Sequence, residues 1–212
     1  LKLTAADIAM LLPAFGVADP AIAGQADVTA SLSSSAKSVS GMVSALAGSG
    51  TVALRGIHAS GLNSAALLPL VQRSDTIGRD LDSAKTASFA PAIVGDGVFD
   101  AGDAQFAFNI AGGTIRMPAT VFDREQAKLT VELRADLAKQ QLAGDGAFVL
   151  RPGDFAQVGS EPAVRLVFAG PLAQPEVAMD TTPLAQFLTQ RQLEIEQARV
   201  EAMQAALLEK QR

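Results

Sequence analysis

Side chains that commonly carry out catalysis are scarce in this chain. His58 is the single histidine, and cysteine is absent. No Gly-x-Ser-x-Gly motif or other nucleophile motif accompanies His58, so nothing indicates a catalytic triad. Asp96, Asp100 and Asp103 lack both the Asp-x-Asp-x-Asp-Gly spacing and the closing glutamate of a calcium loop. We therefore expect no enzymatic activity, no catalytic residue, no metal site and no cofactor.

Glycine-rich segments in this chain indicate turns. Gly48-Ser49-Gly50 and Gly112-Gly113 precede predicted strands, so no helix N-terminus would be placed to receive an anion. Gly95-Asp96-Gly97 and Gly144-Asp145-Gly146 form a weak internal repeat. Asp-Gly favours hairpin turns, because its glycine accepts a positive φ. The repeat therefore predicts two hairpin turns of the same Asp-Gly type.

Apolar side chains alternate with other residues along several segments after Ser88, which is the period of a strand. Such a face has two interpretations. It closes a core, or it lines an open groove that binds an extended acyl chain with a gain of about 0.8 kcal/mol per buried methylene. The candidate groove residues are Phe99, Phe106, Phe108, Ile110, Phe148, Leu166 and Phe168.

Short helices and strands alternate before Ser88. Thr4 followed by Asp7 resembles a capping box for a helix through Leu12, and Asn63 is a candidate cap for a helix through Val71. The other predicted elements are a strand at 22–32, a short helix at 38–46, a strand at 51–58 and a polar loop at 73–87.

Residues 183–212 are predicted to form one long helix, since they begin with proline and contain no glycine. At 1.5 Å per residue the helix would reach about 45 Å, so part of it should extend beyond the domain. Its first half is expected to pack on the sheet. Leu193, Val200 and Leu207 lie seven residues apart and form a candidate stripe for a partner protein or a second copy of the chain.

The length of 212 residues predicts one domain, with residues 1–182 forming its β-rich body and residues 183–212 a packed or projecting helix. The expected fold class is α+β and mostly β. We expect an antiparallel twisted sheet, either closed or open as a groove, with short N-terminal helices and one long C-terminal helix. The predicted oligomeric state is a monomer or a weak dimer.

Charge and hydropathy exclude several partners. The 17 basic and 22 acidic residues give a net charge of −5 without a basic cluster, which argues against nucleic acid. No apolar run is long enough to span a membrane, and no signal peptide opens the chain. The start at Leu1 suggests a fragment of a longer protein, with any anchor upstream. The lack of cysteine fits an oxidising or a reducing compartment.

Five motifs follow one another along the chain: the strand 22–32, the segment 46–57, Gly61-Leu62-Asn63 before a Leu-rich helix, the hairpin 108–116, and 164–172 with Pro175. In this order they resemble the C-terminal region of AsmA-family proteins of the alphaproteobacterial type. That family is similar to TamB and VPS13-like lipid-bridge proteins. Two departures affect turn detail: residue 56 is Gly, and Arg55 replaces a common acidic residue.

The resemblance implies a periplasmic domain of a Gram-negative protein that is attached to the inner membrane through a segment upstream of this chain. It also implies a non-enzymatic role in handling or bridging phospholipid during outer-membrane biogenesis. The expected ligand is a phospholipid or another acyl chain, and no catalytic residue comes with the family. The alternative is a closed-core interaction module whose C-terminal helix binds an envelope protein partner.

Overall fold

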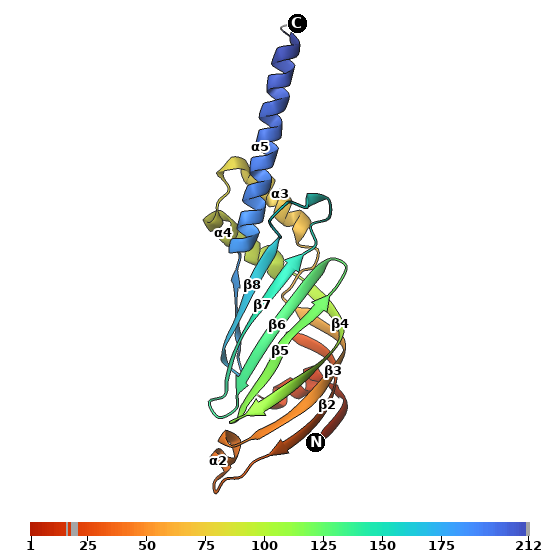
Figure 1. The fold of residues 1–212 in the computed structure, drawn as a ribbon, viewed down its shortest axis with the longest axis vertical. Coiled ribbons are helices and arrows are strands. Elements are labelled where there is room, and N and C mark those ends of the chain that lie inside the picture. Colours follow the sequence, from red (N-terminus) through yellow and green to blue (C-terminus); the bar gives the residue numbers. More distant parts are fainter. Residues whose placement is uncertain (16, 18–20, 211–212) are drawn as a thin grey trace.

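The computed structural model describes residues 1–15, 17 and 21–210, and its main element is one antiparallel sheet of nine strands. The strands pair in chain order, each with the next, so the sheet is an open meander (Figure 1). This confirms the predicted α+β, mostly β class. The strands are β1 (Lys2–Asp7), β2 (Ile22–Ser33), β3 (Ala47–Ser60), β4 (Val98–Ala111), β5 (Thr114–Asp123), β6 (Ala127–Asp136), β7 (Gln141–Leu150), β8 (Ala163–Pro171) and β9 (Glu176–Asp180).

Three of the helices gather at one end of the sheet (Figure 1), and the short helix α1 packs on β2. Figure 1 shows α3, α4 and the first part of α5 together at that end, with α2 at the opposite end and the rest of α5 running away from the body. The α-helices are α1 (Ile8–Leu11), α2 (Val39–Ser44), α3 (Leu67–Ile77), α4 (Ser83–Gly95) and α5 (Thr182–Lys210). The 3-10 helices are η1 (Leu12–Phe15), η2 (Gly78–Asp80) and η3 (Gly153–Phe155).

The sheet curls strongly near its helical end. The rings of Phe99 in β4 and Phe148 in β7 meet edge to face, with centroids 5.4 Å apart. In a flat sheet, strands three positions apart would lie about 14 Å from each other, and their side chains would stand parallel. The two rings therefore touch because the sheet bends toward the face they share. Such an aromatic pair contributes about 0.5–1.5 kcal/mol beyond its burial.

One closed core lies between this curled end and the helices. It combines β4, β6, β7 and β8 with the apolar sides of α3, α4 and α5. The most deeply buried large side chains include Phe99, Phe148, Leu70, Leu184 and Phe187. The predicted packing of the C-terminal helix is thus observed at the end of the sheet.

Residues 73–87, predicted as a polar loop, are mostly helical. α3 continues to Ile77, and α4 begins at Ser83 after the 3-10 turn η2. The polar residues misled the prediction because two of them face the core. Ser74 is buried and donates to the carbonyl of Val71 at 2.7 Å, and Thr86 donates to the carbonyl of Asp82 at 2.9 Å. A hydroxyl that bonds its own helix can be buried at little cost.

Three glycine-rich segments predicted as turns are not hairpins. Gly95-Asp96-Gly97 connects α4 to β4, whereas Gly48-Ser49-Gly50 lies inside β3 and Gly144-Asp145-Gly146 inside β7. In the two strands, the glycines make room for side chains of neighbouring strands. A Cβ on Gly50 would lie 2.6 Å from the Phe108 ring, and one on Gly144 would lie 2.7 Å from Leu133. Gly112-Gly113 does form the predicted turn, with φ angles of 56° and 72°.

The N-terminal caps differ from the predicted ones. Thr4 lies in β1, and Asp7 caps α1 by accepting from the backbone N–H of Met10 at 3.3 Å. Asn63 accepts from the backbone N–H of Ala65 at 2.9 Å, within the turn that precedes α3, rather than capping α3 itself. The short helix at 38–46 is confirmed as α2 with its Ser38 cap, and both predicted N-terminal strands are confirmed with longer bounds.

Helix α5 is attached to the body by a polar cluster at residues 191 and 192. Arg191 makes a bidentate ion pair with Asp75 of α3 and lies over the Phe155 ring at 5.3 Å. Gln192 donates to the same carboxylate at 2.6 Å and is buried. From Leu193 onward most large apolar side chains are exposed, so about 27 Å of helix projects from the body.

The start of α5 is sensitive to pH through Asp180. Hydrogen bonds from the hydroxyl and backbone N–H of Thr182, with a smaller effect of Arg165, lower the pKa of this carboxyl. A depressed folded-state pKa stabilises the fold above the unfolded-state pKa of about 4, and this stabilisation is lost as the pH falls through the folded-state value. We expect Asp180→Asn to lower Tm at pH 7, with the difference from wild type closing as the pH falls through the folded-state pKa of Asp180. Thermal unfolding measures it, and the exposed Glu176→Gln is the matched control.

Candidate functional site

One face of the sheet is apolar across all nine strands. Directly paired residues share a face, so the register traces this face from one edge to the other. We call it the inner face. Five residues of this face, Leu54, Ala104, Met117, Leu133 and Phe168, are partly buried and pack against the core. The rest of the face outside the core consists of Leu3, Ala6, Ala26, Val28, Ala30, Leu32, Gly48, Gly50, Val52, Phe106, Phe108, Ile110, Ile115, Ala135, Leu142, Gly144, Gly170 and Val177.

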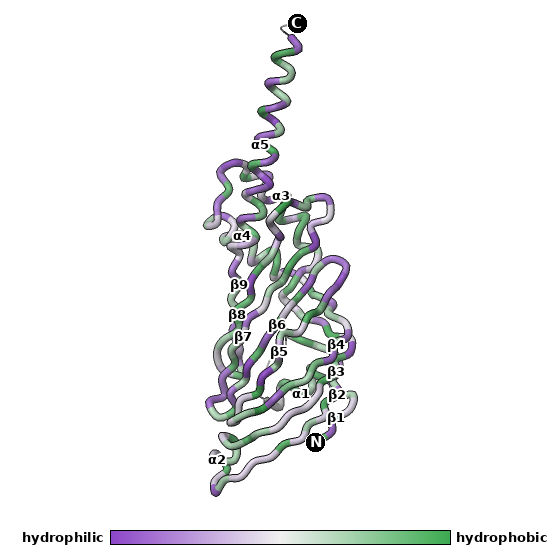
Figure 2. The backbone as a smooth tube through the Cα atoms, viewed as in Figure 1, coloured by the Kyte–Doolittle hydropathy of each residue, from purple (hydrophilic) through white to green (hydrophobic). Residues whose placement is uncertain are grey.

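The other face of the sheet carries the charges. Residues of β6 that alternate with the inner face are Lys128, Thr130, Glu132, Arg134 and Asp136. Figure 2 shows this alternation as hydrophobic and hydrophilic residues following each other along the strands. We call this side the outer face. Because every charged strand side chain paired in this register lies outside, the inner face offers dispersion contacts and apolar burial but no polar recognition.

The candidate groove residues divide into two groups. Phe99, Phe148 and Leu166 are at most 2% exposed and belong to the closed core, so no ligand reaches them without unfolding. The expectation that they line a groove is therefore corrected, because helices cover that end of the sheet. The other candidates lie beyond the helices.

These remaining candidates form the helix-distal part of the inner face. Phe106 and Phe108 of β4 and Phe168 of β8 are half-buried there, and Ile110 is buried beside them. The Phe108 ring leans over Gly50, and the Phe168 ring lies against Gly146, where a Cβ would be 3.3 Å from it. Glycines on the neighbouring strands thus let the aromatic rings lie flat along the sheet.

The sheet is only partly joined between β4 and β5. Their register holds three pairs next to the Gly112-Gly113 turn, ending at Asn109 with Arg116. Beyond this last pair, residues 98–108 of β4 do not pair with residues 117–123 of β5. We call this unpaired stretch the seam. Phe106 and Phe108 lie on its β4 side and Met117 on its β5 side, so the seam borders the half-buried part of the inner face.

Pro118 explains why the pairing stops. Residues that flank a two-residue turn exchange hydrogen bonds, and every second pair along the hairpin does the same. After Ala111 with Thr114 and Asn109 with Arg116, the next such pair would be Ala107 with Pro118. Proline has no N–H to donate, and β5 is also irregular between Met117 and Thr120. The strands therefore separate at this residue.

The far end of the seam is closed by Arg124 from the β5–β6 turn. Its guanidinium donates to the carbonyl oxygen of Ala101 in β4 and lies against Gly102. A Cβ at Gly102 would overlap the guanidinium, and its φ of 64° also favours glycine. The seam is thus bounded by a hairpin at one end and a side-chain bridge at the other. The seam was not predicted from the sequence. Pro118, a proline within an alternating strand, was a signal that could have indicated it.

The predicted partner stripe lies on the projecting part of α5. Leu193, Val200 and Leu207 are 61%, 45% and 61% exposed. Leu184 and Leu188 in the first half of α5 are buried, whereas Ile195 is 41% exposed. The packed stripe ends with the polar cluster at residues 191 and 192.

The polar candidates have structural roles. His58 and Asp100 approach to 3.9 Å on the exposed outer face. Asp100 accepts from the N–H of Gly102, and Asp103 accepts from the N–H of Gly56, so both carboxylates hold irregular points of β3 and β4. Within the described ranges, no cluster of three potential metal ligands is found. In that same part of the chain, no helix has the length and apolar character to cross a membrane.

No family model, curated protein or solved structure matches this chain. The resemblance to the AsmA family therefore depends on the sequence motifs alone. In the structure these motifs fall in β2, in β3, before α3, in the β4–β5 hairpin and in β8.

The role of Pro118 can be tested with a strand-forming residue that has an N–H. We expect Pro118→Val to extend the β4–β5 ladder by one pair and to slow hydrogen exchange of the Ala107 amide at least tenfold. Exchange measured by NMR reports this directly, and Pro171→Val at the end of β8 is the control. An unchanged Ala107 rate would show that the irregularity between Met117 and Thr120 alone separates the strands.

Proposed function

We propose that this chain is a non-enzymatic domain that holds the acyl chains of a lipid on the helix-distal inner face. The observation that supports this is the composition of that face, which is apolar from β1 to β9. Beyond α3, α4 and α5 it carries large side chains that are half-buried, such as Phe106 and Phe108, or exposed, such as Leu32. The hydrophobic core forms at the end of the sheet that α3, α4 and α5 cover. The apolar surface beyond these helices is suited to an apolar ligand.

The energetics of such a site need no polar contact. Each buried methylene contributes about 0.8 kcal/mol, so burying roughly ten methylenes gains on the order of 8 kcal/mol before the cost of ordering the ligand. Phe106, Phe108 and Phe168 add polarizable rings that fit an extended chain. Specificity for chain length or saturation is not expected from such a surface.

The resemblance to AsmA proteins supports the cellular setting of this proposal. The domain would lie in the periplasm, attached to the inner membrane through a segment upstream of this chain. Its ligand would be phospholipid handled or bridged during outer-membrane biogenesis. The apolar inner face is what such a protein would need, and the seam would connect it to the surrounding solvent.

Lipid that copurifies with the protein provides the test. Protein from Gram-negative cells is measured by native mass spectrometry and by organic extraction. We expect about one phospholipid per chain in the wild type, and loss of at least 80% of it in Phe106→Asp and Phe168→Asp, because a carboxylate on the inner face must be desolvated against the acyl chain.

An outer-face variant is the matched control. Ala107→Asp places the same charge on the residue next to Phe106 in β4 and should keep the lipid. Circular dichroism checks that every variant folds, and Phe106→Ser replaces Phe106→Asp if that variant unfolds. A folded wild type without lipid, or equal lipid in inner-face and outer-face variants, contradicts the proposal.

The projecting part of α5 supports a second candidate function, an interaction module. Eighteen residues of helix beyond Gln192 would expose Leu193, Val200 and Leu207 to water at a cost unless another chain covers them. The partner would be an envelope protein or a second copy of this chain in a weak dimer.

Sedimentation over a range of concentrations tests self-association. If α5 pairs with a second copy, the mass of the full chain rises with concentration, and deletion of residues 194–212 abolishes the rise. That cut leaves Asp75, Arg191 and Gln192 intact, so the body should stay folded. Leu207→Gln should weaken the association at least fivefold, while Leu208→Gln, which lies off the stripe, should not. A constant monomer mass would rule out the dimer.

A further inference from the structure

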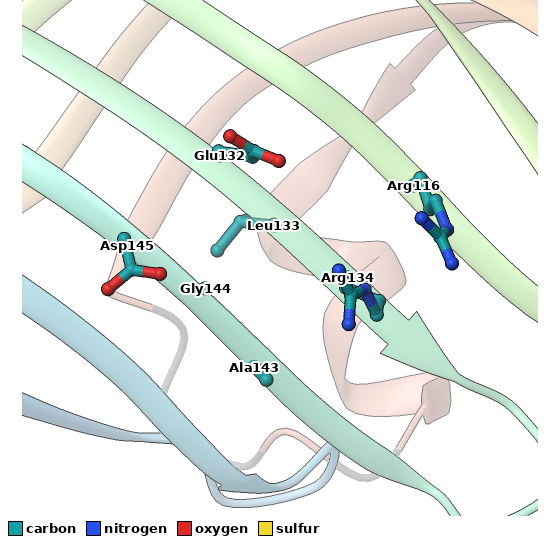
Figure 3. A pocket seen from close by; sticks show the side chains of 7 residues that line it. All are labelled: Arg116, Glu132, Leu133, Arg134, Ala143, Gly144 and Asp145. Atoms are coloured by element: carbon teal, nitrogen blue, oxygen red, sulfur yellow. The ribbon is translucent and has the colours of Figure 1, made fainter.

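Four charged residues line a shallow hollow on the outer face of β5, β6 and β7. Arg116 lies directly opposite Arg134, and Glu132 directly opposite Asp145. Figure 3 shows the two arginines together at one end of the hollow and the two carboxylates at the other. The backbone of Leu133, Ala143 and Gly144 forms its floor.

This arrangement is unfavourable for the sheet itself. Like charges placed directly opposite each other on neighbouring strands destabilise a sheet. Within the described part of the chain, none of the four has an oppositely charged group within 4.0 Å. Elsewhere on the outer face the cross-strand charges are complementary, as for Asp123 opposite Lys128 and Arg165 opposite Asp180. The hollow therefore separates charge where the rest of the face pairs it.

The hollow also adjoins the seam. Arg116 is the last residue of β5 that pairs with β4, and the next residue, Met117, faces the inner side at the border of the seam. The hollow on the outer face and the half-buried part of the inner face therefore lie next to the same unpaired stretch between β4 and β5. Phe106 and Phe108 lie on the inner side of that stretch.

We propose that this hollow binds a zwitterionic headgroup that combines a phosphate with an amine, with the acyl chains of the same lipid passing through the seam onto the inner face. The phosphate lies between Arg116 and Arg134, which satisfy its oxygens by charge-assisted hydrogen bonds. The ammonium group lies between Glu132 and Asp145. The acyl-chain part of this inference depends on the function proposed above, whereas the headgroup part does not.

The two carboxylates decide which lipid fits. A purely anionic headgroup would gain the arginines but would be repelled by Glu132 and Asp145. A headgroup carrying both charges uses both ends of the hollow and neutralises both like-charge pairs. Selectivity for phosphatidylethanolamine over phosphatidylglycerol follows from this charge separation.

The first measurement is an NMR titration of the full chain with soluble O-phosphoethanolamine, which has no acyl chain. We expect saturable amide shifts at Arg116, Arg134, Glu132 and Asp145. They should be lost in Arg116→Gln/Arg134→Gln and retained in the control Lys2→Gln/Lys37→Gln, which removes two charges at exposed sites outside the hollow. Absence of shifts at these amides in the wild type overturns the headgroup site.

The second measurement uses vesicles of equal phosphatidylethanolamine and phosphatidylglycerol. The protein is equilibrated with them, repurified, and its bound lipid identified by mass spectrometry. We expect the wild type to take phosphatidylethanolamine at least threefold over phosphatidylglycerol. Glu132→Gln/Asp145→Asn should reverse or abolish that preference, and Arg116→Gln/Arg134→Gln should lower the uptake of both lipids.

The two measurements separate the two proposals. Bound lipid with the same composition in the wild type and both double variants overturns the link between hollow and lipid but leaves the inner face as an acyl site. Shifts with phosphoethanolamine but no bound lipid in any variant overturn the lipid-holding function and leave the headgroup site standing.

Discussion

The closed core beneath the helical end of the sheet holds the rest of the structure in place. There, the contact between Phe99 and Phe148 draws together strands that lie three positions apart, and α3, α4 and α5 cover the curled end. The 22 buried apolar residues of this cluster come from strands β3 to β8, from the three helices and from the segments that lead into α3 and α4. Loss of this core would release the curl, and the inner face would become an ordinary exposed sheet surface.

The same strand pattern gives two different environments along the sheet. At the helical end, the apolar face is dry and inaccessible. Toward the other end, the alternation continues beyond α3, α4 and α5, where the short helix α1 packs on β2, and Phe106, Phe108 and Phe168 are half-buried. Glycines at 50 and 146 allow these rings to lie along the sheet rather than project from it. The sheet thus has an apolar surface outside the closed core, next to the residues whose burial stabilises the fold.

Two irregular features bound the stretch of β4 and β5 that has no ladder pairs and that borders the inner face. Pro118 ends the pairing of β4 with β5, and Arg124 joins the two strands again near Ala101. Between them the backbone ladder is interrupted, and the charge-separated hollow lies directly beside the interruption. The apolar inner face and the charged hollow of the outer face adjoin at Arg116 and Met117, which are consecutive residues of β5. The polar cluster of Asp75, Arg191 and Gln192 lies between α3 and α5. It fixes the point at which α5 leaves the body.

The amino-acid sequence by itself determined the local elements and the two faces of each strand. Period-two alternation placed Phe106, Phe108 and Phe168 on apolar faces, and the Gly-free C-terminal segment formed the long helix. It misplaced residues 73–87 and the glycines of β3 and β7, because a buried hydroxyl and a glycine that admits a neighbour look like loop signals. Only the tertiary structure decided that Phe99, Phe148 and Leu166 are core while Phe106, Phe108 and Phe168 are half-buried. Alternation states which side a residue faces, but what covers that side depends on helices distant in the chain, on the curl of the sheet and on pairing that stops at a single proline.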